Sequence, residues 1–150
     1  MAKAGLRDTR QTFFDAARRR AREARALLDH PPAQKQRDGA VTMALVAAEC
    51  ALKAALLHGM QANSVEDLQG APVAGLFSGK KGHDLLQLWR GLPMPISAQA
   101  TAVESQAMNC LNAADPYLHR YGVKKPNRGL AEPLVASAER LVEWMRHLVI

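Results

Sequence analysis

Aromatic residues are scarce in this chain: they make up 5% of its 150 residues, although 48% of the residues are hydrophobic. A core must therefore be built mainly from Leu, Ala, Val and Met. Ala and Leu favour helices, whereas strands are enriched in aromatic and β-branched residues. No stretch alternates polar and apolar residues for long enough to predict a strand. We expect an all-α protein, with a single domain over residues 1–150.

Long apolar runs and cysteines are also few. No run approaches the ~18 apolar residues that a membrane span needs, and residues 1–20 lack the apolar centre of a secretory signal. We therefore expect a cytoplasmic protein with no membrane partner. Cys50 and Cys110, the two cysteines, lie in apolar helical surroundings and predict buried thiols rather than a disulfide. No ligand spacing predicts a metal site, and no cofactor is expected.

Acidic residues are outnumbered by basic ones, which leaves a net charge of +6 and a pI of about 9.7. This balance favours an anionic partner such as RNA, a nucleotide or an acidic protein. Within an expected first helix over residues 8–28, Arg18, Arg22 and Arg25 form a row. The row either faces phosphate or belongs to a solvated face. Asp15, Arg19 and Glu23 predict a ladder of ion pairs on the same helix.

The stretch 38–59 predicts a central helix around which the rest of the chain is organised. Asp38 is placed to cap its start, and Gly59 to end it in a left-handed conformation. Glu49 and Lys53 are a charged pair in this otherwise apolar stretch, and we expect them to face a groove between helices or subunits. One broad apolar face is expected from residues at helical spacing: Val41, Leu45, Ala48, Leu52 and Leu56.

Five further segments complete the expected bundle. Residues 33–37 predict a short polar connector, so the first two helices should form an antiparallel hairpin. Residues 60–82 predict a long loop with one helical turn near residues 66–68. Helices are then expected over residues 83–90, 97–115 and 130–149. Pro133 is expected in the first turn of the last helix, where proline is tolerated.

A basic, aromatic segment lies before the last helix. It contains His119, Arg120, Tyr121 and Lys124, which combine positive charges with an aromatic face that suits a nucleotide. A basic connecting loop without a ligand is the other interpretation of the same residues.

Three motifs in this order resemble the HEPN domain, the "higher eukaryotes and prokaryotes nucleotide-binding" family. The motifs are AECALKAALL, KGHDLLQL and YLHRYG, and the resemblance covers residues 10–148. It implies an up-and-down bundle of about five helices, commonly a homodimer, with a polar groove for a nucleotide or RNA. It also implies a two-protein system in which the partner is a minimal nucleotidyltransferase, as in toxin–antitoxin or defence pairs. The ligand-binding candidates are Glu49, Lys53, His83, Arg120, Tyr121 and Lys124.

Many members of that family are metal-independent ribonucleases that use an arginine followed by a histidine five to seven residues later. In this chain Arg120 has no such histidine. Arg140 and His147 have the spacing, but Leu141 follows the arginine where the family usually has a polar residue. The catalytic candidates are therefore Arg140, His147 and His119, and we expect a non-catalytic nucleotide- or RNA-binding module. A metal-independent ribonuclease is the first alternative, and a structural protein-interaction module is the second.

Overall fold

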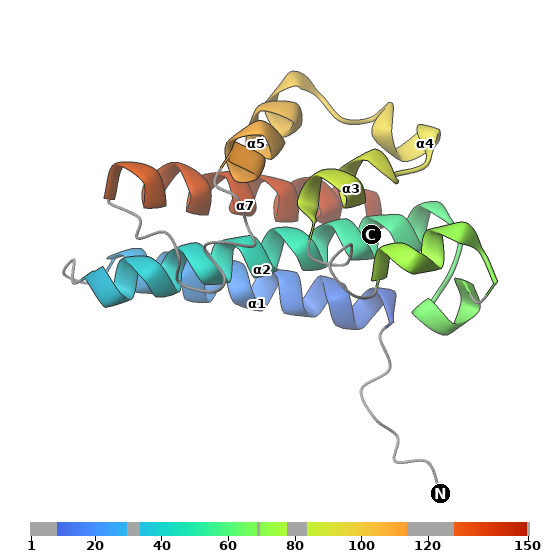
Figure 1. Cartoon of the computed structure of the whole chain (residues 1–150), viewed down its shortest axis with the longest axis horizontal. Helices are drawn as coiled ribbons and strands as arrows, with labels where there is room; N and C mark the ends of the chain where they lie inside the picture. The colour runs from blue at the N-terminus through green and yellow to red at the C-terminus, as the bar shows by residue number, and fades with distance from the viewer. Residues whose placement is uncertain (1–8, 30–33, 69, 78–83, 114–127, 150) are drawn as a thin grey trace, which may run out of the picture.

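The computed structural model describes residues 9–29, 34–68, 70–77, 84–113 and 128–149 (Figure 1). These residues form six α-helices and two short 3-10 helices, and no strand beyond one isolated bridge between Thr9 and Ser64. The α-helices are α1 (Arg10–Asp29), α2 (Gln34–Gly59), α3 (Leu85–Arg90), α4 (Met94–Ser97), α5 (Ala102–Ala113) and α7 (Arg128–Val149). The 3-10 helices are η1 (Val65–Leu68) and η2 (Pro72–Phe77). The all-α class predicted from the sequence is confirmed.

Three long helices, α1, α2 and α7, lie side by side, and α3, α4 and α5 cover one side of the layer that they form (Figure 1). Helix α1 runs antiparallel to both of its long neighbours. Its first turns lie beside the end of α2, where Phe13 contacts Lys53, and its last turns lie beside the start of α7, where Arg25 contacts Glu132. The predicted antiparallel hairpin of the first two helices is confirmed.

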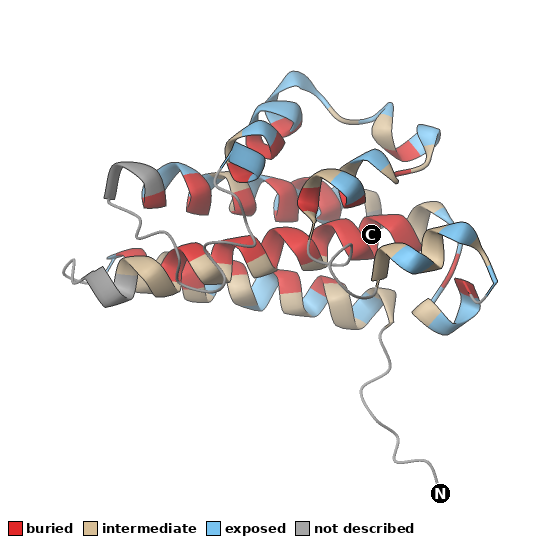
Figure 2. Ribbon diagram, in the orientation of Figure 1, coloured by how far each residue is buried: buried red, intermediate tan, exposed pale blue. Residues whose placement is uncertain are grey.

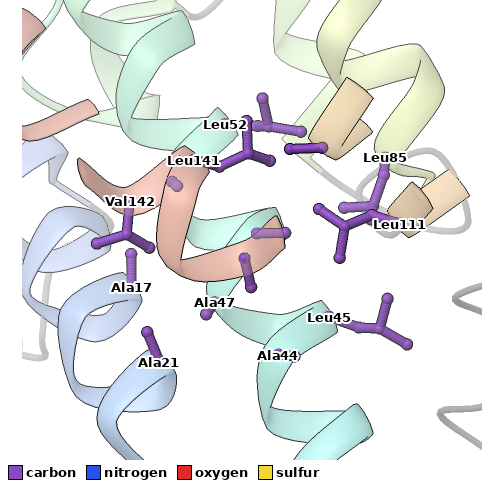
Figure 3. Packing of buried hydrophobic residues seen from close by; sticks show 14 of the residues in the cluster. Ala17, Ala21, Ala44, Leu45, Ala47, Leu52, Leu85, Leu111, Leu141 and Val142 are labelled. Carbon is purple, nitrogen blue, oxygen red and sulfur yellow. The ribbon is translucent and has the colours of Figure 1, made fainter. Parts of the chain in front are cut away.

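Helix α2 is the centre of the core, because α1 packs on one of its sides and α7 and α3 pack on others (Figure 2). Its predicted apolar face is confirmed, since every residue of that face is buried. Small side chains allow the long helices to approach one another closely. Figure 3 shows this for α1 and α7, where Ala17 and Ala21 lie beside Val142. The alanines of α2 that are at most 2% exposed include Ala44, Ala47, Ala51 and Ala55.

One expectation about apolar runs needs correction. The stretch Arg37–Gly59 of α2 is long and apolar enough to cross a membrane by length and composition alone. However, 78% of its most apolar window is buried inside the protein. Burial by neighbouring helices is typical of a core helix in a water-soluble domain, so the apolar character of α2 is explained by packing.

The predicted start of the central helix and the left-handed conformation of Gly59 are wrong, whereas the predicted end at Gly59 is confirmed. Helix α2 begins at Gln34, so Asp38 lies inside it, and the Asp38 carbonyl accepts a hydrogen bond of 2.9 Å from the Thr42 hydroxyl. Gly59 is not left-handed; Gln61 adopts the positive φ, at 56°. A larger residue at position 59 would clash with its neighbours, because a Cβ there would lie 2.8 Å from Ile96 Cγ1 and 2.8 Å from Pro93 Cγ. The glycine permits α4 to approach the end of α2.

The predicted helix over residues 97–115 is divided in the structure. Pro95 lies in the first turn of α4, a position that proline favours, and α5 begins only at Ala102. Thr101 starts α5 by accepting a hydrogen bond of 3.2 Å from the Val103 N–H. In this helix Val103 is 47% exposed, whereas Glu104 is buried.

The remaining elements follow the sequence more closely. Asp84 caps α3 by accepting a 3.2 Å hydrogen bond from the Gln87 N–H, and the predicted turn near residues 66–68 is η1. The second 3-10 helix, η2, was not expected. Pro133 lies in the second turn of α7 rather than the first, because this helix begins at Arg128. Cys50 and Cys110 form no disulfide, as predicted, but both are half-buried rather than fully buried.

Candidate functional site

The described residues include four of the candidate residues from the sequence. Glu49 and Lys53 lie on α2, and Arg140 and His147 lie on α7. The other candidates fall outside the described residues: His83, His119, Arg120, Tyr121 and Lys124.

Glu49 and Lys53 form an ion pair inside the protein. Lys53 Nζ lies 3.1 Å from Glu49 Oε2, and each residue is only 7% exposed. Lys53 Nζ also lies 5.7 Å from the centre of the Phe13 ring of α1, which is within the range of a cation–π contact. The expectation that this pair avoids open solvent is confirmed, and the groove it faces is the seam between α1 and α2. Its burial suits a role in packing these helices.

Arg140 and His147 are both exposed on α7, and the described residues bring no second histidine to them. His147 is 68% exposed at its side chain, and its Nε2 lies 3.2 Å from Glu143 Oε1. Arg140 instead acts on Glu104 of α5, where its charge helps to lower the pKa of that carboxyl group. The larger cause of the lowered pKa is the hydrogen bond that the Thr101 hydroxyl donates to Glu104.

A groove of about 610 Å³ runs between α1 and α7, and four arginines line it. All three arginines of the row predicted from the sequence line it, and α7 adds Arg146. The groove is lined by Arg18, Ala21, Arg22, Arg25, Ala26, Asp29, Glu139, Val142, Glu143 and Arg146. We call this surface the arginine groove.

Arg25 clamps the two helices that form the groove. Its Nε and Nη2 donate to the two carboxylate oxygens of Glu139, and its Nη1 lies 3.0 Å from Glu132 Oε1. The bond to Glu139 is the largest cause that raises the pKa of Arg25 above its ordinary value. A bidentate contact of this kind fixes the guanidinium plane. Arg25 therefore serves as a cross-link in the groove, with its charge already neutralised.

Arg18 and Arg22 are the available cations of the groove. Both are exposed, and within the described parts of the chain neither forms an ion pair. The Arg18 guanidinium lies 5.6 Å from the centre of the Phe14 ring, which orients it without neutralising it. One helical turn separates the two side chains, so they lie on the same face of α1.

Arg146 approaches the same end of the groove from α7. Its Nη2 lies 2.7 Å from Glu143 Oε1. This contact is the first cause of the raised pKa of Arg146 and of the lowered pKa of Glu143. Because both side chains are nearly half exposed, the pair is weak and can open to a competing anion.

The predicted ladder of Asp15, Arg19 and Glu23 is wrong. Asp15 accepts a hydrogen bond of 2.9 Å from Gln11, and Glu23 pairs with Arg20 at 2.7 Å. Arg19 is exposed but does not line the arginine groove. It therefore differs from Arg22 mainly in its position on α1.

The residues that α7 contributes to the groove were missed at the level of sequence. A signal was present: Glu132, Glu139 and Arg146 recur every seven residues and so lie on one face of a helix. A charged stripe of this kind, in a helix whose other face is apolar, indicates contact with a second charged stripe. Arg18, Arg22 and Arg25 were the matching stripe on α1.

The described residues contain no group of three or more His, Cys, Asp or Glu side chains placed to hold a metal ion. What the groove offers is guanidinium groups at one end and a fixed ionic cross-link at the other. Such an arrangement can bind an anion by charge and by hydrogen bonds. In the comparisons with known proteins, no family model, no curated protein and no solved structure matches this chain.

Proposed function

We propose that this protein is a HEPN-like module that binds a nucleotide or RNA in the arginine groove. The observation that carries the proposal is the position of Arg18 and Arg22, two exposed cations that have no ion-pair partner among the described residues and line the same groove. Guanidinium groups bind phosphate through paired hydrogen bonds. The net charge of +6 supports the same choice of ligand.

The arrangement of helices supports the HEPN-like part of the proposal in some respects. The three long helices α1, α2 and α7, with the shorter α3 and α5, correspond to a bundle of about five helices. The pair α1–α2 has the up-and-down order of such a bundle. Helices α2 and α7 point the same way, since both are antiparallel to α1, and this departs from a strict alternation of neighbours.

The proposed role is that of a binding partner in a two-protein system, with a minimal nucleotidyltransferase as the second protein, as in toxin–antitoxin or defence pairs. The protein itself is proposed to be a homodimer without catalytic activity. The positions of Arg140 and His147 support the absence of catalysis. Ribonuclease chemistry requires a proton-transfer group held beside the scissile phosphate, and His147 is exposed and bound to Glu143.

The proposal is tested by titrating the protein into a fluorescein-labelled 12-nucleotide RNA and into a labelled adenine nucleotide, with fluorescence anisotropy as the readout. The double variant Arg18→Gln/Arg22→Gln should weaken binding about ten-fold or more, because hydrogen bonds to charged groups contribute about 1.5–3 kcal/mol each. Raising the salt concentration from 50 to 200 mM should weaken wild-type binding as well.

Arg19→Gln is the matched control, since it removes the same charge from the same helix outside the groove. Arg120→Ala is a companion variant for the basic segment predicted from the sequence, where a similar loss is expected. Equal affinity for wild type and the groove variant would contradict the proposal. Absence of binding at low salt would contradict it too, and would favour the structural protein-interaction module.

A further inference from the structure

The two ends of the arginine groove carry opposite charge. At one end Arg18 and Arg22 of α1 meet Arg146 of α7, and Glu143 is the single carboxylate among them. At the other end Arg25 is surrounded by three carboxylates, which are Asp29, Glu132 and Glu139. The polarity follows from the antiparallel packing of α1 against α7, which aligns the charged stripes of the two helices.

Among these carboxylates, Asp29 is the most exposed and makes the longest contact with Arg25. Arg25 donates hydrogen bonds to both carboxylate oxygens of Glu139, and it donates a third hydrogen bond to Glu132. Asp29 lies farther from Arg25, at 3.8 Å, and its side chain is 65% exposed. It is also the last residue of α1, where the helix dipole disfavours negative charge. A positive or N–H-donating ligand group beside Asp29 would offset this unfavourable interaction between its negative charge and the helix dipole.

We infer that the groove holds a short dipolar ligand along α1, with its anionic group at Arg18 and Arg22 and an amino group at Asp29. The inference rests on the proposed function and narrows it. Asp29 lies seven positions after Arg22 on α1, which corresponds to roughly 10 Å along the helix axis. This distance is comparable to the length of a nucleotide from phosphate to base. A long RNA would bring further phosphates against Asp29 and Glu139, so a mononucleotide fits the charge pattern better.

The test compares two ligands that differ by one amino group. Adenosine 5′-monophosphate carries an amino group on its base, and purine riboside 5′-monophosphate has hydrogen in its place. Isothermal titration at low salt should give an affinity about five-fold higher for the adenosine compound, the upper range for an exposed charged contact. In Asp29→Ala the two ligands should bind equally, whereas Arg22→Gln should weaken both of them.

Asp15→Ala is the matched control, because Asp15 is an exposed acid of α1 that does not line the groove. Equal affinity of wild type for the two ligands would overturn the inference, as would a preference that survives in Asp29→Ala. Binding of the 12-nucleotide RNA through Arg18 and Arg22 without binding of either mononucleotide would overturn the inference and leave the proposed function standing. Failure of the RNA and both mononucleotides would overturn the two together.

Discussion

The protein holds charge in two different ways, in its interior and in the arginine groove. In the interior, Glu49 pairs with Lys53 on its own helix, and Glu104 accepts a hydrogen bond from Thr101 on the turn before it. In the groove, Arg25 reaches from α1 to α7, and Arg18 and Arg22 carry charge that the described residues leave unpaired. Local partners satisfy the buried groups, whereas the groove keeps cations accessible.

The difference separates structural charge from charge that is available for binding. A buried ion must be compensated or the fold loses stability, so Glu49 and Lys53 have little freedom to exchange their contact for a ligand. An exposed guanidinium has no such penalty and can pair with phosphate. The charged pair of α2 is therefore suited to stabilising the packing of α1 against α2, whereas the proposed binding site lies between α1 and α7.

The largest expected effect is on the buried pair. Lys53→Met removes one partner and leaves the Glu49 carboxylate in the α1–α2 seam without its lysine, which should lower the free energy of unfolding by about 3 kcal/mol. Urea unfolding followed by circular dichroism measures the loss.

The double variant Glu49→Leu/Lys53→Met serves as its control. Replacing both charges by apolar side chains should recover most of the stability and leave ligand binding unchanged. A double variant that is well folded but has lost RNA or nucleotide binding would break the comparison, because the pair would then be part of the ligand site.

A good part of the fold could be predicted from sequence, because the buried face of α2 and the inward residues of α7 repeat at helical spacing. A helix over residues 83–90 was predicted, but Asp84, which the prediction placed inside it, is its cap. The division between α4 and α5 was not predictable, since the helical spacing of apolar residues continues from Ile96 to Ala107 across the break. Whether the helix continues across this point or starts again at Ala102 depends on which hydrogen bond Thr101 makes.

The candidate site was predictable only on one of its helices. The row of Arg18, Arg22 and Arg25 was visible in the sequence, but two interpretations of it were equally simple. Tertiary packing decides between the members of the row: Arg25 becomes a cross-link because Glu139 of α7 lies opposite it. The spacing within each helix indicates a charged stripe, but it does not determine which residue of the other helix lies opposite Arg25.

A smaller effect is expected at the second buried acid. The pKa of Glu104 is held below its ordinary value of 4.5, first by the Thr101 hydroxyl, so its carboxylate form stabilises the fold. This contribution is complete at neutral pH and is lost as the pH falls below 4.5 and through the lowered pKa. Thr101→Val should cost about 1 kcal/mol at pH 7, part of it from the lost cap on α5.

The pH dependence separates the two parts of that cost. The difference in unfolding free energy between wild type and Thr101→Val should shrink as the pH is lowered below 4.5, because Glu104 becomes protonated in both proteins. Ser105→Ala, on the exposed side of the same helix, is the control and should be nearly neutral. A cost that stays constant with pH would show that Thr101 acts only as a helix cap.

The smallest expected effect concerns catalysis, where we predict no change at all. A 5′-labelled RNA incubated with the purified protein should remain full length, and the variants Arg140→Gln, His147→Ala and His119→Ala should give the same result. The Thr101 hydroxyl and, to a smaller extent, the charge of Arg140 lower the pKa of Glu104 of α5, whereas His147 contacts Glu143 at the solvent. Cleavage by wild type that is lost in His147→Ala, with the fold intact, would contradict this prediction and would indicate that the groove belongs to a ribonuclease site. Glu143 would then link His147 to the groove, because it contacts His147 and the groove's Arg146 through the same oxygen.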